Sequence, residues 1–428
     1  METYKFETQW LEKLASTSQE FQAENASFYD GSRKEKVTTH NERMMKLSPL
    51  FASQPKFEKV CNDEKNKLVH SGFTSYLITV QSNHTSKDLN ELHKLADDLK
   101  YIVNFWGHNL TELIIIGYTF SKILPTIKIT CPNLKILNLA FEEIEIKDFE
   151  NVFSNMSHLE ELTIDWKCEN LPLPTILVES IEQVGGTLKS LELANFAKTN
   201  DRRLPDSFVS VFPRLIVLEY LSLHGFGDLN QALIQSISEI KSLVSLSLVP
   251  VWVEDLECNM YPIGNLKNLE RLNIRTDCGV TDEFLINLSN NAKNLKKLAI
   301  FATNITDKGI MALNKFTQLE ILDLNSRLSQ KNNEFITDQS VEYLISNQQL
   351  EMLDISNCIK ITDSSVLKLV KNIKYLRDLY LKETSLTVEL AKKLRDITDT
   401  TEIRETSLLV HVPIEKKNSD NDTSENAP

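Results

Sequence analysis

The stretch "LEMLDISNCIKITDSSVLKLV" (350–370) brings together residue types that could perform nucleophilic chemistry. Cys358 carries a thiol, Asp354 and Asp363 carry carboxylates that could act as acid or base, and Ser356 adds a hydroxyl. A thiol is reactive only in an exposed, electropositive setting, whereas a free cysteine is usually buried and inert. The stretch is therefore either a reactive site or one turn of a repeated scaffold.

The rest of the sequence does not indicate catalysis. The eight histidines do not recur near any candidate nucleophile, so no nucleophile–histidine pair is indicated. The phosphate-binding motifs G-x-x-x-x-G-K-[ST] and G-x-G-x-x-G are absent. "VGGTL" (184–188) indicates the end of a helix, where glycine adopts the left-handed conformation. We therefore expect a protein that is not an enzyme and that uses no cofactor.

Composition argues against several classes of partner. The chain of 428 residues has 47 Lys and Arg against 60 Asp and Glu, and this net charge of −13 opposes binding to nucleic acid or to anionic membranes. Its six cysteines show no C-x-x-C spacing, which argues against a zinc site and a dense disulfide framework and favours a reducing compartment. The sequence shows neither a signal peptide nor an apolar run of about 18 residues. We expect a cytoplasmic protein, and a nuclear location also fits.

A repeated pattern of leucines explains most of the chain. The motif L-x-x-L-x-L, with Ile in some copies, recurs eleven times at spacings of 24 to 31 residues, within or slightly beyond the period of leucine-rich repeats. The first leucines of the copies are Leu110, Leu134, Leu159, Leu188, Leu218, Leu243, Leu269, Leu295, Leu319, Leu350 and Leu376. The last two apolar positions of each copy lie two residues apart, so they point from a short strand into the core.

A helix start follows the later strands. Thr lies between an apolar residue and Asp in four copies, with a weaker fifth copy at Leu386, and these threonines are Thr281, Thr306, Thr337 and Thr362. A threonine hydroxyl at the N-cap accepts a free backbone N–H, and Asp in the first turn meets the positive end of the helix dipole. Ile361 and Val366 then fit a hydrophobic staple. The predicted fold is α/β: a curved, right-handed solenoid with parallel strands on the concave face and helices outside.

Three strings carry a resemblance to a known family. "LDISNCIKITDSSVLKLV", "LNIRTDCGVTDEFLINL" and "LAIFATNITDKGIMAL" resemble the cysteine-containing leucine-rich repeats of F-box proteins, over about residues 75–405. In that family the solenoid captures a substrate protein, and an amino-terminal F-box of three helices binds the adaptor of a cullin-based ubiquitin ligase. The repeat prefers Asn or Cys at the position of Cys358, where the side chain turns inward.

The chain divides into three predicted parts. Residues 1–70 form a helical segment, residues 71–405 form the solenoid of about 11 repeats, and residues 406–428 form a closing strand and a disordered polar tail. "SYLITV" (75–80) predicts an opening strand. The longest spacing contains "SRLSQKNNEF" (326–335), which predicts a surface loop because it is polar.

The amino-terminal segment has two interpretations. The Leu-Pro pair that opens an F-box is missing from it, and only Phe57, Val60 and Cys61 resemble the end of an F-box, without the Trp that follows there in the family. The resemblance implies that these three residues bind the adaptor if the F-box functions. The alternative is a helical cap over the apolar end of the first repeat, because terminal repeats need covering.

The outward positions of the strands predict the binding face, because they lie on a rigid concave support. Arg271, Arg275 and Lys297 form a basic patch next to Phe301, an arrangement that anchors an acidic or phosphorylated segment of a partner. The other candidate contacts on this face are Trp166, Tyr220, His224, Met352, Asp354 and Tyr380.

Two functions follow from this face and the resemblance. The first is a substrate receptor, in which the solenoid binds a protein and residues 1–70 bind the adaptor of a cullin-RING ubiquitin ligase. The second is a ligase-independent scaffold or decoy that binds a protein without a working F-box. Neither function needs nucleic acid, a membrane or a metal.

Overall fold

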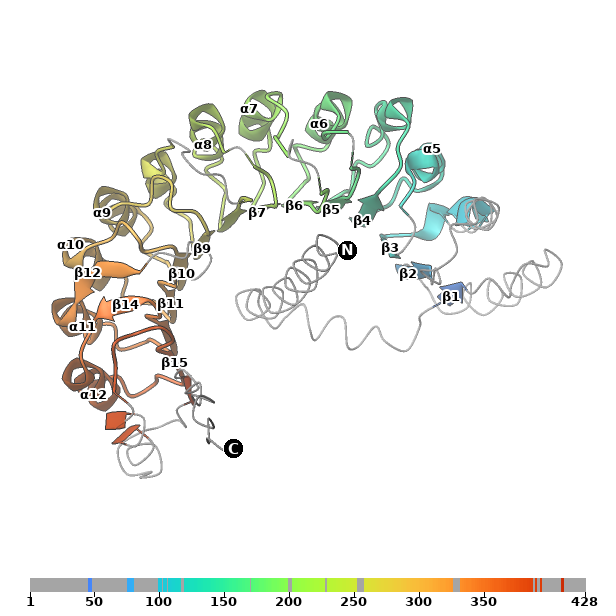
Figure 1. Ribbon diagram of the computed structural model, residues 1–428. Coiled ribbons are helices and arrows are strands. Elements are labelled where there is room, and N and C mark those ends of the chain that lie inside the picture. Colours follow the sequence, from blue (N-terminus) through green and yellow to red (C-terminus); the bar gives the residue numbers. More distant parts are fainter. Residues whose placement is uncertain are drawn as a thin grey trace, which may run out of the picture.

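The chain forms an arc in which strands line the concave side and helices and turns line the convex side (Figure 1). The structure is a computed structural model, and it describes residues 45–47, 75–80, 99–101, 103–105, 107–116, 119–169, 171–198, 202–227, 229–251, 258–325, 332–387, 389–390, 393–394 and 409–411. Most repeats place one strand in the same sheet, so the repeats stack side by side along the arc. The fold is a leucine-rich-repeat solenoid, and the predicted fold class is confirmed.

The concave side is one parallel sheet. Over the described residues it has 14 strands, which follow one another in chain order. They are β1 (Met45–Leu47), β2 (Ser75–Val80), β3 (Glu112–Ile116), β4 (Ile136–Phe141), β5 (Glu161–Trp166), β6 (Ser190–Asn195), β7 (Tyr220–His224), β8 (Ser245–Val249), β9 (Arg271–Ile274), β10 (Lys297–Ile300), β11 (Ile321–Asp323), β13 (Met352–Asp354), β15 (Asp378–Tyr380) and β16 (Leu409–His411). A second sheet pairs β12 (Asn333–Thr337) with β14 (Cys358–Lys360).

Helices and short 3-10 turns cover the convex side. The α-helices are α5 (Leu124–Thr130), α6 (Thr175–Glu182), α7 (Phe208–Val211), α8 (Gln231–Ile237), α9 (Asp282–Asn291), α10 (Asp307–Ala312), α11 (Asp338–Leu344) and α12 (Asp363–Asn372). The 3-10 turns are η2 (Gly107–Asn109), η3 (Ser121–Ile123), η4 (Ile146–Phe149), η5 (Phe212–Arg214), η6 (Tyr261–Asn265) and η7 (Leu313–Lys315). None of the helices described is long and apolar enough to cross a membrane.

A shared carbonyl fixes the register of neighbouring strands. The Glu160 carbonyl oxygen accepts the N–H groups of Lys189 and Ser190, at 2.8 and 2.9 Å, where the next strand begins. The same two-donor contact recurs at the start of each strand from β4 to β11 and at β13 and β15. Because a slip of one residue would move every apolar side chain to the opposite face, this contact determines which side chains enter the core.

The repeated leucines form one continuous core. All three apolar positions of each motif copy are buried, with exposures of at most 2%. Phe149, Phe208 and Phe284 fill the space between the strands and the convex elements. The predicted inward positions are confirmed, and each repeat completes its core only with the leucines of its neighbours.

The Thr-Asp helix starts link one repeat to the next. Thr337 donates both its backbone N–H (2.9 Å) and its hydroxyl (2.7 Å) to the carboxylate of Asp307 in the preceding repeat. Thr306, Thr362 and Thr387 make the same pair of bonds to Asp282, Asp338 and Asp363. Thr337 also caps α11 as predicted, by accepting the N–H of Gln339. The first-turn aspartates therefore join the repeats, a role that the helix-dipole argument missed.

These bonds stabilise the ionised aspartates. Burial raises the pKa of Asp307, but the hydrogen bonds donated by Ser340 and Thr337 outweigh it and hold the pKa below its ordinary value. Burial likewise raises the pKa of Asp338, and the bonds from Ser365 and Thr362 lower it further than burial raises it. Both aspartates therefore contribute to stability in their charged form.

The longest spacing between motif copies, from Leu319 to Leu350, reflects an insertion between a strand and the bend that follows it. Asn333 pairs with Cys358 in the next repeat, but it lies nine residues after Leu324, whereas Cys358 lies three residues after Ile355. The Asn333 side chain donates to the Ile305 carbonyl oxygen at 2.9 Å and is 1% exposed. The prediction of a loop over residues 326–335 is therefore wrong at residues 333–335, which begin β12; residues 326–331 lie outside the described part.

The ends of the sheet extend beyond the predicted solenoid. "SYLITV" is strand β2 as predicted, but Met45–Leu47 forms β1 beside it, within a segment predicted to be helical. The closing strand is β16, which pairs with β15. Phe57, Val60 and Cys61 of the amino-terminal segment lie outside the described residues, and so does the predicted polar tail after β16.

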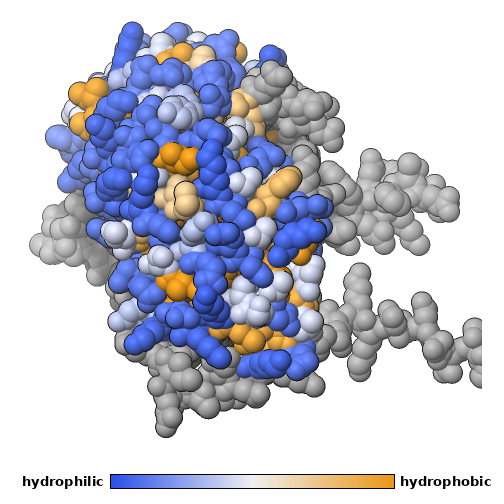
Figure 2. Space-filling model, turned by 90° about the vertical axis from the view of Figure 1, so that its left-hand side faces the viewer, coloured by the Kyte–Doolittle hydropathy of each residue, from blue (hydrophilic) through white to orange (hydrophobic). Residues whose placement is uncertain are grey.

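The side of the molecule on the left of Figure 1 is mainly hydrophilic. Figure 2 shows this side, with small, separated hydrophobic areas on it. Exposed apolar residues on the convex elements and beside them are far apart in the chain, such as Ile129, Ile216 and Met311. The separated hydrophobic areas in Figure 2 do not form a continuous apolar surface of the kind that marks a large interface.

We expect Asp307→Ala to destabilise the protein by about 2–4 kcal/mol, because it leaves the donors of Thr337 and Ser340 without their acceptor. Chemical denaturation at pH 7 measures the change. The effect should shrink below about pH 4, since a carboxyl with a lowered pKa loses its contribution as it is protonated. Glu239→Ala, at an exposed carboxylate of the convex side, is the control, and equal destabilisation by both changes would contradict the inter-repeat role.

Candidate protein-binding face

The sheet register arranges the outward side chains in three rows across the strands. The amino-terminal row lies at the starts of β7 to β11, β13 and β15. It contains Tyr220, Ser245, Arg271, Lys297, Ile321, Met352 and Asp378. The central row contains Ser222, Ser247, Asn273, Ala299, Asp323, Asp354 and Tyr380. The carboxyl-terminal row, at the strand ends, contains His224, Arg275, Phe301, Asn325 and Ser356.

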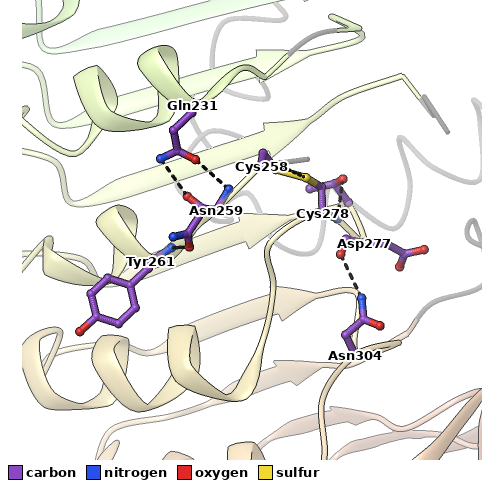
Figure 3. Close-up of a disulfide and its surroundings, with 8 residues drawn as sticks. Gln231, Cys258, Asn259, Tyr261, Asp277, Cys278 and Asn304 are labelled. Atoms are coloured by element: carbon purple, nitrogen blue, oxygen red, sulfur yellow. Dashed lines mark hydrogen bonds between the residues drawn. A yellow bond between two sulfur atoms is a disulfide. The ribbon is translucent and has the colours of Figure 1, made fainter. Parts of the chain in front are cut away.

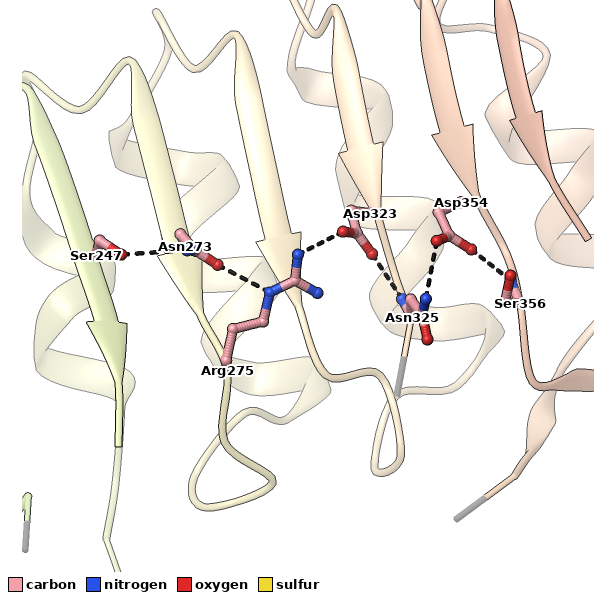
Figure 4. Close-up of polar contacts among 7 residues, drawn as sticks. All are labelled: Ser247, Asn273, Arg275, Asp323, Asn325, Asp354 and Ser356. Atoms are coloured by element: carbon pink, nitrogen blue, oxygen red, sulfur yellow. Dashed lines mark hydrogen bonds and ion pairs between the residues drawn. The ribbon is translucent and has the colours of Figure 1, made fainter. Parts of the chain in front are cut away.

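The central and carboxyl-terminal rows form a polar network (Figure 4). Arg275 lies at its centre: its Nε donates to the Asn273 side-chain oxygen at 3.0 Å, and its Nη2 contacts an Asp323 oxygen at 2.5 Å. Asn273 in turn donates to the Ser247 hydroxyl at 3.1 Å. The side chains of Arg275 and Asp323 are each 12% exposed. This ion pair spans strand β10 and joins β9 to β11.

Asp354 extends the network to the next repeat. It accepts the side-chain N–H of Asn325 at 3.0 Å and the backbone N–H of Ser356 at 2.8 Å. Burial raises the pKa of Asp354 to about 7, and the charge of Asp323 on the adjacent strand raises it as well. Arg275 compensates Asp323, so Asp354 is the member of the carboxylate pair that takes up a proton near neutral pH.

Four predicted contact residues lie in the floor of the face or in the core. Trp166 points inward with Leu162 and Ile164, is fully buried, and donates its ring N–H to the Leu171 carbonyl oxygen at 2.9 Å. Its prediction as a contact is wrong because it has the inward parity of β5. Phe301 is only 2% exposed, with the Arg275 guanidinium carbon 5.8 Å from its ring centre. Asp354 and Arg275 belong to the network described above.

The other predicted residues remain accessible. Tyr220 is 39% exposed, and Arg271, Lys297 and Met352 are partly exposed in the same amino-terminal row. The guanidinium carbon of Arg271 lies 5.1 Å from the centre of the Tyr220 ring, which is a cation–π contact across β8. The sequence predicted these four residues as one face, and the register shows that they share a single row.

His224 and Tyr380 lie away from this row. His224 is half-buried at the end of β7, its ring 5.9 Å from that of the exposed Phe196, and burial lowers its pKa. Tyr380 is partly exposed in the central row of β15. Phe196 was not predicted, since it follows its strand rather than alternating within it.

An acidic region lies on the earlier strands. Glu161, Asp165 and Glu192 are partly exposed on β5 and β6. Burial raises the pKa of Asp165 to about 6, with a further increase from the charge of Glu192 and an opposing effect of Lys167. The concave face therefore changes from acidic on β5 and β6 to basic at Arg271 and Lys297.

A disulfide joins two loops beside β9 (Figure 3). Cys258 and Cys278 are 20 residues apart in sequence, with their Cα atoms 5.5 Å apart. Asn259 gives its backbone N–H to the Gln231 side-chain oxygen at 2.9 Å, which holds the same segment against α8. Gly279 has a φ of 71°, and a side chain there would meet the Cys258 carbonyl oxygen at 2.5 Å. The absence of C-x-x-C spacing gave no signal for this bond, which is one link and not a framework. The bond counts against the reducing compartment that the cysteine spacing favoured.

The remaining described cysteines are thiols inside the core. Cys358 is fully buried, and burial raises its pKa far above the ordinary value, followed by a smaller effect of Asp354. Burial also raises the pKa of Cys131 to about 11 and that of Cys168 to about 12. The described residues contain no group of three or more His, Cys, Asp or Glu side chains that could hold a metal ion. The stretch 350–370 is therefore one turn of the scaffold, and its thiol is protonated and enclosed.

Comparisons with known proteins give distant structural matches. No family model matches the chain. A chain in the crystal structure of the Rad7 and Elc1 complex of yeast has a TM-score of 0.45 and 19% identity, over 85% of this chain and 86% of that chain. A leucine-rich-repeat protein of Leptospira interrogans has a TM-score of 0.38 and 15% identity, over 79% of this chain and 89% of that chain. The assignment of the fold rests on the register and the repeated core described above.

We expect Asp354→Asn to stabilise the protein more at pH 8 than at pH 5. A carboxyl whose pKa is raised to about 7 loses its contribution to stability as pH rises from about 4 to 7, and the amide removes that loss. Denaturation midpoints of the variant and the natural chain at both pH values measure the difference. Glu239→Gln, at an exposed carboxylate, is the control, and a difference independent of pH would contradict the assignment.

Proposed function

We propose that the protein is a non-catalytic binding module that holds a segment of another protein against the amino-terminal row. The observation that carries this proposal is the accessible set of Tyr220, Arg271, Lys297 and Met352 on one rigid row. Tyrosine, arginine and methionine are enriched in protein interfaces, where a few such side chains supply most of the binding energy. A row on paired strands also needs little reordering on binding, which favours affinity.

We also propose that this module is the substrate receptor of a cullin-based ubiquitin ligase, working in the cytoplasm or the nucleus. Support comes from the resemblance of residues 75–405 to the repeats of F-box proteins and from Phe57, Val60 and Cys61, which resemble the end of an F-box. In this function the amino-terminal segment binds the adaptor while the row binds the substrate.

A ligase-independent scaffold or decoy is the second candidate. It is favoured by the missing Leu-Pro opening in residues 1–70 and the missing Trp after Val60 and Cys61. Strand β1 at Met45–Leu47 also favours it, because a strand paired with β2 extends the sheet, whereas an F-box consists of helices. The two candidates share the binding row and differ only in what the amino-terminal segment does.

Quantitative co-purification from cells separates these functions. We expect the full chain to retain one or a few proteins that Tyr220→Ala/Met352→Ala loses by about tenfold or more, since truncating central contacts costs more than about 1 kcal/mol each. An adaptor and a cullin should be retained by both chains and lost when residues 1–70 are deleted.

The controls make each outcome decisive. Ile129→Ala/Met311→Ala changes two exposed apolar residues of the convex side and should leave the bound proteins unchanged. If the concave variant keeps every bound protein, the row does not carry the binding function. If bound proteins are present without adaptor or cullin, the scaffold or decoy is the correct function.

A further inference from the structure

Two cations of the amino-terminal row have no carboxylate partner among the described residues. Arg271 makes a cation–π contact with Tyr220, and neither its side chain nor that of Lys297 makes a hydrogen bond or ion pair within the described part of the chain. Elsewhere in the same repeats cations are paired: Lys296 with Glu270, and Arg275 with Asp323. In a chain with a net charge of −13, two adjacent unpaired cations on a concave face form a local positive site.

We infer that the amino-terminal row binds an extended acidic segment of a partner protein, with one carboxylate at Arg271, another at Lys297 and an apolar side chain on Ile321 and Met352. This inference rests on the proposed binding function and names the chemistry of its partner. The argument comes from charge complementarity and from the order of side chains along the row.

The stacking of Arg271 prepares its guanidinium for a carboxylate. Its guanidinium carbon lies over the Tyr220 ring, 5.1 Å from the ring centre, which is a cation–π contact. A cation–π contact uses none of the guanidinium N–H groups as hydrogen-bond donors, so they can donate two parallel hydrogen bonds to one carboxylate. The stack also fixes the side chain before binding, which reduces the entropy lost when the partner binds.

The spacing of the two cations fits alternate residues of an extended chain. Arg271 and Lys297 are direct neighbours across β9 and β10, and neighbouring strands lie about 4.8 Å apart. Arg271 leans toward β7, away from Lys297, so the charges lie farther apart than the strands. Side chains on one face of an extended peptide repeat about every 6.8 Å, so acids at positions i and i+2 match this separation.

The apolar neighbours set the order of the partner. Ile321 pairs with Lys297 in the register, and Met352 pairs with Ile321, so both lie on the side away from Arg271. Each is partly exposed. A segment that lies along the row therefore contacts Arg271 on its aromatic ring first, then Lys297, and then the apolar side chains of Ile321 and Met352.

Carboxylates fit this site better than a phosphate. A phosphate is best bound by several donors that converge on one dianion, and the third cation of the face, Arg275, is held by Asp323 at 2.5 Å. The two remaining cations are drawn apart by the Tyr220 contact, which suits two separate single charges.

A displayed library of about twelve-residue peptides tests the inference. The library is selected on the full chain and counter-selected on Arg271→Glu/Lys297→Glu. We expect enriched peptides to carry Asp or Glu at i and i+2 followed by an apolar residue. Replacing either acid by its amide should weaken binding of the synthetic peptide by about tenfold or more, and affinity should fall as salt increases.

Lys267→Glu/Lys374→Glu is the matched control, because it changes the net charge equally at two exposed lysines outside the concave rows. Arg271→Gln/Lys297→Gln repeats the test without adding negative charge, and unchanged denaturation midpoints establish that the variants are folded. Peptides that bind the reversed variant equally well or that carry no acid dependence would overturn the inference. Tighter binding of a synthetic peptide with phosphoserine in place of the two acids would overturn it as well. Loss of the cellular partner by Tyr220→Ala/Met352→Ala would still support the binding function in that case.

Discussion

The register of the sheet depends on one carbonyl oxygen in each repeat that accepts two backbone N–H groups from the next. Glu160 does this for the start of β6, and Glu270 does it for the start of β10. Because side chains alternate along a strand, this contact decides at once which leucines are buried and which residues face the concave side. The core, the polar network and the candidate binding row all follow from the same alignment.

The concave face has two parts with different physical roles. The polar groups of Arg275, Asp323 and Asp354 are used within the protein, and their hydrogen bonds offset the cost of burying them. The amino-terminal row keeps Arg271 and Lys297 accessible, with Tyr220 beside them. Residues of similar type therefore serve stability in one row and are available for recognition in the next.

Periodic features were predictable from the sequence, and three-dimensional neighbours were not. The leucine spacing gave the fold and the strands, and the order Thr-Asp gave the helix starts. The Thr-Asp order did not reveal that Asp307 accepts a hydrogen bond from Thr337 of the next repeat, because that contact depends on how the repeats stack. Trp166 was misplaced because the leucine motif ends at Ile164, whereas β5 and its inward alternation continue to Trp166. The Cys258–Cys278 bond depends on loops with no periodic signal.

The ion pair between Arg275 and Asp323 joins residues 48 apart in sequence and passes over an entire strand. Tyr220 and Arg271 span β8 in the same way. Each contact connects two strands across an intervening strand on the concave side of the arc. Flattening the arc would therefore move the two partners of each contact apart. The curvature of these middle repeats is therefore fixed by side chains on the concave surface as well as by the bulk of the helices on the convex side. A partner that binds along this curve meets a surface of constant shape.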